Sequence, residues 1–235
     1  MKFEPKENLL QILYEDNHLI IVNKPAGMLV QEDDTGDISL VELVKEYLRT
    51  KYQKPGEAFC GVVHRIDRPV SGLVIFAKTS KGLERMHALF RERKITKTYW
   101  AAVRMKPPHD SGTLFHWLLK DRNTNTVKAF NKPVRNGVEA ELRYRIIARA
   151  GNYFLLEVNP ITGRPHQIRA QLAKIGCPIQ GDVKYGFSQP NRDEHSICLH
   201  SRQVSFIHPV QKVPLVVSAR LPQTSDWQRF NDLNL

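Results

Sequence analysis

Short apolar segments of strand length, separated by clusters of turn-forming residues, recur along the whole chain. The first two segments flank Glu15-Asp16-Asn17, and a later pair flanks Gly151-Asn152. Two such segments joined by a short turn predict a pair of antiparallel strands. The segments expected to form strands are 10–13, 19–22, 62–63, 73–77, 99–103, 140–148, 153–158 and 213–219.

Three other stretches have the apolar spacing that is typical of helices. The first begins after Ser39 and extends to about residue 52, and the second covers 79–93. The third starts at Pro165 and ends before Gly176, because proline suits a first helical turn and glycine suits the C-cap. Many strands with few helices indicate an α+β fold. The polar, turn-rich stretch 107–137 is expected to be a mobile excursion.

A net charge of +11 over 235 residues is the strongest signal in the composition. It favours a polyanionic partner, either nucleic acid or an anionic membrane, although many basic proteins bind neither. The charge is spread over several short stretches and no amphipathic basic helix stands out, so nucleic acid is favoured. The basic stretches include 91–94, 104–106, 120–122 and 143–145.

Targeting and redox signals are weak. No apolar run approaches the roughly 20 residues that cross a bilayer, and the polar N-terminus does not resemble a signal peptide. We therefore expect a cytoplasmic protein with no membrane contact. Cys60, Cys177 and Cys198 form neither a disulfide framework nor a metal-binding pair, and the histidines lack HExxH or zinc-finger spacing. No metal is expected, and Cys60 is interpreted as a buried strand residue rather than a catalytic thiol.

The run Gly61–Gly72 places Asp67 between Arg65 and Arg68, after a short apolar segment and before a Pro-x-Ser-Gly turn. Opposite charges nearby favour the ionised form of a carboxylate. A turn at a strand end is a common position for side chains that face a ligand. Asp67 is therefore a candidate nucleophile or base acting on a polyanion.

A second informative stretch, residues 159–169, leads from a Thr-Gly turn into the third predicted helix. Arg164, His166, Gln167 and Arg169 lie in its first turns, where the helix dipole favours an anion such as phosphate or carboxylate. Arg169 can also pair with a buried carboxylate. The alternative is a helix with an ordinary solvated polar face, and the residues alone leave both open.

Tyr99 follows Lys97-Thr98 and has two interpretations. An aromatic ring among basic residues can stack on a nucleobase. A tyrosine packed in the sheet with its hydroxyl hydrogen-bonded is the other interpretation, and from the residues alone it is favoured.

Six segments taken together resemble the RluA family of pseudouridine synthases, in the family's order and over nearly the whole chain. His64-Arg65-Ile66-Asp67 with Ser71-Gly72 resembles its HRLDxxTSG signature. The other five segments are 23–27 (NKPxG), 97–101 (KxYxA), 162–169 (TGRxHQIR), 178–186 (PIxGDxxYG) and 199–201 (LHA or LHS). Ile66, Val70, Pro165 and Ala170-Gln171 depart from the family's pattern without removing a proposed catalytic residue.

The resemblance implies a mostly antiparallel central sheet with flanking helices and an RNA-binding cleft. It also implies the isomerisation of uridine to pseudouridine in tRNA or rRNA, without cofactor or metal. Asp67 would be the catalytic carboxylate, as nucleophile or as base. Arg169 would pair with Asp67 and orient it, and Tyr99 would stack on the uracil.

Further assignments follow from the same resemblance. Arg65 would enter the RNA stack where the target base has flipped out, and Leu199 would form the apolar wall of the uracil pocket. His64, Arg164, His166 and Gln167 are assigned to substrate binding. We expect a polar extension over residues 1–8, one pseudouridine synthase domain over 9–225 and a C-terminal tail over 226–235.

The chain is expected to be a monomer without the S4 RNA-binding domain of many relatives, so its basic surface must supply RNA affinity, which should fall with salt. The excursion 107–137 is a candidate for contacts that select the RNA target. Two other functions are weighed. One is an RNA-binding or RNA-folding protein without catalysis, which the charge supports equally but which has no need of Asp67. The other is a nuclease or N-glycosylase, which ranks last because a second carboxylate is not evident.

Overall fold

The computed structural model describes residues 10–33 and 36–231. The expected N-terminal extension over residues 1–8 lies outside the described residues. The described residues form two compact units: those up to residue 96 together with 201–220 make unit 1, and 97–200 together with those from 221 onward make unit 2.

Unit 1 is built on antiparallel strands. β1 (Gln11–Glu15) pairs with β2 (Leu19–Lys24), β2 pairs with β4 (Ser71–Ala77), and the short β3 (Gly61–Val62) also pairs with β4. β10 (Leu199–Ile207) lies next to β4 and pairs with β11 (Pro214–Ser218), and the boundary between the units falls inside β10, after His200. Both β2 and β4 are apolar and almost entirely buried, which places them at the centre of this core.

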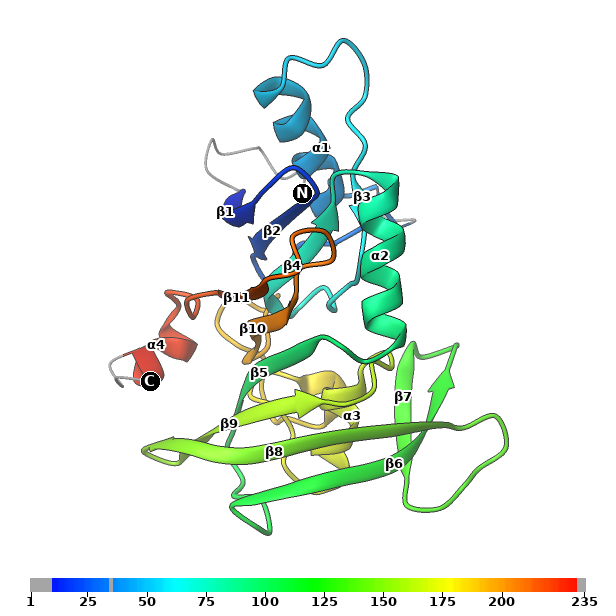
Figure 1. Ribbon diagram of the computed structural model, residues 1–235. Coiled ribbons are helices and arrows are strands. Elements are labelled where there is room, and N and C mark those ends of the chain that lie inside the picture. The colour runs from blue at the N-terminus through cyan, green and yellow to red at the C-terminus, as the bar shows by residue number, and fades with distance from the viewer. Residues whose placement is uncertain (1–9, 34–35, 232–235) are drawn as a thin grey trace. The chain divides into compact units, whose positions relative to one another are not determined.

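The two helices of unit 1 begin where the capping residues predict. α1 (Leu40–Lys51) starts after Ser39, which forms a capping box with Glu42. α2 (Ser80–Arg91) starts after Thr79, whose hydroxyl accepts the N–H of Gly82 at 3.1 Å. α2 lies along β3 and β4, and its Met86 is fully buried in a cluster with the strands (Figure 1).

Close approach of two strands explains the glycine in the signature motif. Gly72, the second residue of β4, has a φ of +111°, a conformation that other residues rarely adopt. A Cβ atom at Gly72 would overlap the backbone nitrogen and carbonyl oxygen of Ser201 in β10. The glycine is therefore required by both the backbone conformation and the spacing of β4 and β10.

We expect Gly72→Ala to lower the free energy of unfolding by at least about 2 kcal/mol, because the methyl group strains the backbone and separates the strands. Gly56→Ala is the matched control, since nothing lies within 4 Å of a Cβ at that position. Urea unfolding measures both variants. Equal midpoints for the two variants would contradict this explanation of Gly72.

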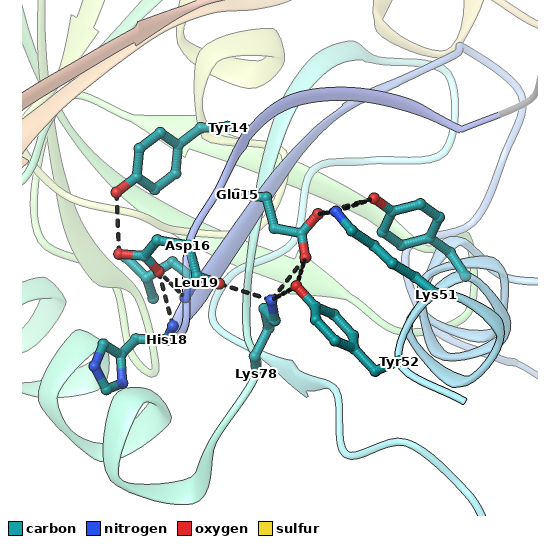
Figure 2. A network of polar contacts seen from close by, with 9 residues as sticks. Tyr14, Glu15, Asp16, His18, Leu19, Lys51, Tyr52 and Lys78 are labelled. Carbon is teal, nitrogen blue, oxygen red and sulfur yellow. Dashed lines mark hydrogen bonds and ion pairs between the residues drawn. The ribbon is translucent and has the colours of Figure 1, made fainter. Parts of the chain in front are cut away.

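A polar network joins β1 to α1 and to the residue after β4 (Figure 2). Glu15 accepts hydrogen bonds from Lys51 at 2.7 Å and from Lys78 at 2.6 Å. Tyr47 and Tyr52 donate to the same carboxylate at 2.9 and 2.8 Å. Burial raises the pKa of Glu15, but the hydrogen bonds outweigh it and bring this pKa down to about 2.

The depressed pKa of Glu15 predicts a pH dependence of stability. The ionised carboxylate stabilises the fold above its unfolded pKa of about 4.3, and this contribution is lost as the pH falls through that value toward about 2. It amounts to at most about 3 kcal/mol. We expect Glu15→Gln to be less stable at pH 7 and to lose less stability on acidification than the unmodified protein. Urea unfolding at pH 7 and pH 3 measures this, and parallel losses in both proteins would contradict it.

The strands of unit 2 pair antiparallel in the order β5-β9-β8-β6-β7. Its strands are β5 (Thr96–Val103), β6 (Ser111–Asp121), β7 (Thr126–Phe130), β8 (Val138–Ala150) and β9 (Tyr153–Pro160). α3 (Gln167–Lys174) lies over this sheet, and a short 3-10 turn, η1 (Val183–Tyr185), follows it (Figure 1). Leu118, Val127 and Ala140 from three strands form one apolar cluster with Ala170 of α3.

Two parts of unit 2 differ from the sequence-based expectations. The expected excursion 107–137 was wrong in large part, because β6 and β7 form a regular hairpin in which Trp117 lies opposite Phe130. His116 and Leu118 of β6 are buried, which is the alternation typical of a strand. Charged residues around the turn between β6 and β7 make this alternation hard to see in the sequence. The expected C-terminal tail contains α4 (Ser225–Asn231), whose Trp227 is buried through tertiary contacts such as the edge contact with His200.

Across the described ranges, no helix is long and apolar enough to cross a membrane.

Candidate active site

The loop that carries Asp67 in unit 1 is fixed at both sides of the carboxylate. It follows β3, and the N–H of Val63 donates to the carbonyl of Ile75 in β4 at 3.3 Å. Ile66 is buried, and the N–H of Val70 donates to the carbonyl of Asp67 at 3.0 Å to close a turn. Between these points Asp67 is half-buried and Arg65 is exposed. The loop thus presents Asp67 and Arg65 at the surface from a rigid base.

Arg68 has two partners that the sequence did not suggest. Its Nε donates to the carbonyl of Gly27 at 2.9 Å, and its Nη2 contacts the carboxylate of Asp37 at 2.6 Å. The N–H of Gly27 donates back to the carbonyl of Arg68 at 2.9 Å. Arg68 therefore joins the Asp67 loop to the turn after β2.

Lys24, which ends β2, is the buried cation of this region and was not singled out by sequence reasoning. Its side chain is fully buried, and Nζ donates to the carbonyls of Met28 at 2.8 Å and of Pro25 and Arg68 at 3.0 Å. Burial lowers the pKa of Lys24 to about 7, while the nearby Asp67 carboxylate acts in the opposite direction. A lysine in the NKPxG segment is the only signal in the sequence that marks this position.

We expect Lys24→Met to lower the free energy of unfolding by about 2–4 kcal/mol, because one buried and two partly buried carbonyl groups lose their donor. Lys81→Met, which changes an exposed lysine of α2, is the control. Thermal and urea unfolding of the two variants provide the measurement. A Lys24→Met protein as stable as the control would show that these hydrogen bonds contribute little.

His64 supports the same loop. Its Nε2 accepts the backbone N–H of Ile75 at 3.2 Å, and its ring lies 5.2 Å from the ring of Phe90 in α2. These contacts indicate that His64 anchors the start of the loop to β4 and α2. A direct contact of His64 with substrate stays a prediction.

In unit 2, Tyr99 faces the same side of the sheet as α3. Directly opposed residues of antiparallel strands share a face; Tyr99 lies opposite Val158, and Val158 lies opposite Tyr144. Tyr144 shares its face with Ala140 by strand alternation. Ala140 belongs to the apolar cluster that includes Ala170 of α3. The half-buried Tyr99 therefore points to the side on which α3 places its basic residues.

Arg169 of α3 is held by a buried carboxylate from the following turn. Its Nε lies 2.7 Å from Oδ2 of Asp182 and its Nη2 lies 2.9 Å from Oδ1, with both side chains at most 5% exposed. The ring of Tyr185 lies under the guanidinium, 4.8 Å from its Cζ. Sequence reasoning interpreted 176–186 only as a family segment, so the pairing of Arg169 with Asp182 was missed. The expected pairing of Arg169 with Asp67 stays a prediction.

The polar residues around the start of α3 divide into two groups. Gln167 is buried; its Oε1 accepts from Thr162 and from the N–H of Arg164, and its Nε2 donates to the carbonyl of Glu141. These contacts indicate that Gln167 supports the turn, and its contact with RNA stays a prediction. Arg164 is exposed and donates through Nε to the carbonyl of Glu139, which leaves this basic side chain at the surface.

His166 precedes α3 in a left-handed conformation with φ of 49°. Its Nδ1 lies 2.8 Å from the hydroxyl of Tyr185. This geometry explains why α3 begins at Gln167, later than the expected start at Pro165. Leu199 is buried at the first position of β10, next to Cys198, whose carbonyl accepts the N–H of Ala102 in β5.

The three thiols do not suit nucleophilic chemistry. All three cysteines are buried, and burial raises the pKa of Cys60 to about 12 and that of Cys177 to about 11. Within the described part of the chain, no group of three or more His, Cys, Asp or Glu residues could hold a metal ion.

Comparisons with known proteins agree with these motifs. The family model described as RNA pseudouridylate synthase matches residues 18–174, which is more than half of the chain. The chain belongs to this family. This membership confirms the family and the enzyme class that the sequence predicted, namely an RNA pseudouridine synthase and therefore an isomerase.

Individual relatives of the pseudouridine synthase family show the same likeness. A ribosomal large subunit pseudouridine synthase C of Buchnera aphidicola subsp. Baizongia pistaciae is 33% identical over 219 residues, which cover 89% of this chain and 66% of that protein. A tRNA pseudouridine synthase C of Vibrio parahaemolyticus is 31% identical over 238 residues, which cover 94% of this chain and 93% of that protein. The chain thus spans about two thirds of the first relative and nearly all of the second.

The fold is confirmed by a solved structure. Human RNA Pseudouridylate Synthase Domain Containing 4 matches with a TM-score of 0.75 at 23% identity, over 91% of this chain and 89% of that chain. The predicted α+β pseudouridine synthase fold with a mostly antiparallel sheet is therefore correct. An RNA partner follows from the family.

Proposed function

We propose that this chain converts specific uridines of structured tRNA or rRNA into pseudouridine, with Asp67 as the catalytic carboxylate. The observation that carries the proposal is the family's signature aspartate on a loop braced by Lys24 and Ile66, which leaves the carboxylate half-exposed. Such bracing presents an anion in a fixed position without the cost of reorganisation during the reaction.

The reaction that we propose breaks the N1–C1′ bond of uridine, turns the uracil and joins C5 to C1′. C5 then loses its proton, and N1, which no longer bonds to the sugar, carries a proton in the product. Asp67 acts at the sugar, as nucleophile at the electron-poor C1′ or as base toward a sugar proton. The bonds broken and formed lie within one nucleoside, so the isomerisation balances without an oxidant, a reductant or a cofactor.

The other catalytic and substrate-binding roles are proposed from the family motifs. Tyr99 stacks on the uracil, and Arg169 orients the reacting groups. Leu199 provides an apolar wall, and Arg65, which is exposed beside Asp67, fills the space that the flipped base leaves in the RNA.

Both RNA classes are included because relatives named for tRNA and for ribosomal RNA match the chain at similar identity. The test incubates the purified protein with unmodified tRNA and rRNA transcripts and measures pseudouridine by nuclease digestion and mass spectrometry. Pseudouridine at defined positions in one of the two classes is the expected result. Free uracil or cut strands would indicate the N-glycosylase or nuclease alternative instead.

Binding measured in the same samples separates catalysis from binding alone. Tight, salt-sensitive RNA binding without product on any cellular RNA would favour the non-catalytic alternative, which nothing in the comparisons supports. The cytoplasmic location, the monomeric state and the role of the β6–β7 hairpin in target choice stay predictions.

A further inference from the structure

We propose that Tyr185 is a positioning residue that holds Arg169 and His166 in the arrangement needed for pseudouridine formation. The inference rests on the proposed function of Arg169, and it assigns a role to a tyrosine that has none in the proposed mechanism. All the contacts that carry it lie within unit 2.

The first contact is with Arg169. Asp182 holds the edge of the guanidinium with two hydrogen bonds, and the ring of Tyr185 covers its face, with Cζ 4.8 Å from the ring centroid. A planar cation held at its edge and on its face has little freedom to rotate, and an aromatic face attracts it electrostatically. Asp182 and Tyr185 belong to one turn, since the N–H of Tyr185 donates to the carbonyl of Asp182 at 3.0 Å.

The second contact is with His166. The Tyr185 hydroxyl lies 2.8 Å from Nδ1 of His166, and the two rings meet edge to face at 5.8 Å. The hydroxyl is therefore the hydrogen-bond partner of this ring nitrogen. His166 is thereby held at the turn that precedes α3.

The third contact ties Tyr185 to the sheet. The backbone N–H of Val127 in β7 donates to the Tyr185 hydroxyl at 2.9 Å, and the ring packs against the apolar cluster of Leu118, Val127, Ala140 and Ala170. One side chain thus connects the hairpin, the turn before α3 and the Arg169–Asp182 pair. The Tyr185 hydroxyl has both a backbone donor and an imidazole partner, which packing of the ring alone would not require.

Two substitutions test the ring and the hydroxyl of Tyr185 separately, and a third serves as the control. Tyr185→Phe keeps the ring over Arg169 and removes the hydroxyl, whereas Tyr185→Leu removes both. Lys184→Ala changes the exposed neighbour on the same turn and is the matched control. Each protein is assayed for the single-turnover rate constant of pseudouridine formation at saturating enzyme, for the Kd of RNA and for Tm.

We expect Tyr185→Leu to lower the rate constant about tenfold, with Kd within about threefold of the unmodified value. Tyr185→Phe should lower the rate constant less, by about threefold, because only the hydroxyl contacts with His166 and Val127 are lost. In an Arg169→Lys background, Tyr185→Leu should have much less effect, because it acts through a guanidinium that is no longer present. A stability effect alone would not produce this non-additivity at a temperature well below Tm.

A Tyr185→Leu protein with an unchanged rate constant would overturn the inference, as would full additivity with Arg169→Lys. Where Tyr185→Leu does not fold, Tyr185→Met fills the space with a flexible apolar chain and takes its place in the same comparisons. Failure of the proposed function is recognised separately, because the unmodified protein would then form no pseudouridine on any RNA.

Discussion

Asp67→Asn is expected to abolish pseudouridine formation, with a loss of about 10³-fold or more in the rate constant. Asparagine has nearly the same shape as aspartate, so the loop that Ile66 and Lys24 hold is expected to keep its conformation. What is lost is the negative charge, and with it both proposed roles of the side chain: attack on C1′ and removal of a sugar proton.

Two controls make the Asp67 result specific. Asp37→Asn removes an exposed carboxylate of the same unit, the one paired with Arg68, and should leave most of the activity. RNA binding by Asp67→Asn should stay within about threefold, because affinity comes mainly from contacts between basic residues and phosphates. Product formed at the normal rate by Asp67→Asn would sink the assignment of this residue.

The second large effect is expected at the buried Arg169–Asp182 pair. Asp182→Ala removes both hydrogen bonds that Asp182 accepts from the buried guanidinium of Arg169, and the expected loss is about 3–5 kcal/mol of the free energy of unfolding. Domains are typically stable by only about 5–15 kcal/mol, so this change should lower the urea midpoint substantially.

A double variant distinguishes stability from function at this pair. Arg169→Met with Asp182→Leu replaces both charges by apolar groups of similar volume and should recover most of the lost stability. It should remain inactive, because the proposed mechanism requires the guanidinium. Activity in the double variant would show that Arg169 serves only the fold, and an Asp182→Ala protein of normal stability would show that the pair is not energetically coupled.

Helix starts and strand pairs between neighbouring segments could be predicted from short sequence patterns. Ser39 and Thr79 mark the starts of α1 and α2, since capping acts between residues two or three positions apart. The strand pairs β1–β2 and β8–β9 follow from apolar segments around short turns. The β6–β7 hairpin was missed, because its buried residues, such as His116, Leu118 and Val127, lie among many polar and charged residues and their alternation is evident only when α3 covers them.

The site was predictable to a different extent. The ordered motifs identified the family and the candidate residues Asp67, Tyr99 and Arg169 without any structure. Sequence reasoning left some charge partners out: Arg68 contacts Asp37, and Lys24 lies buried near Asp67. Charge pairing depends on which side chains are buried together, and separation along the chain carries no information about it.

The sequence by itself determined the family, the identity of the signature aspartate and the positions of most helices and strands, because these depend on motifs and on contacts between near neighbours. Only the tertiary structure decided that Lys24 donates to a carbonyl 44 positions away, that Asp182 holds Arg169, and that the Tyr185 hydroxyl meets Val127 58 positions away. Each of these contacts satisfies a polar group that folding removes from water, and that requirement arises only when distant segments are buried together.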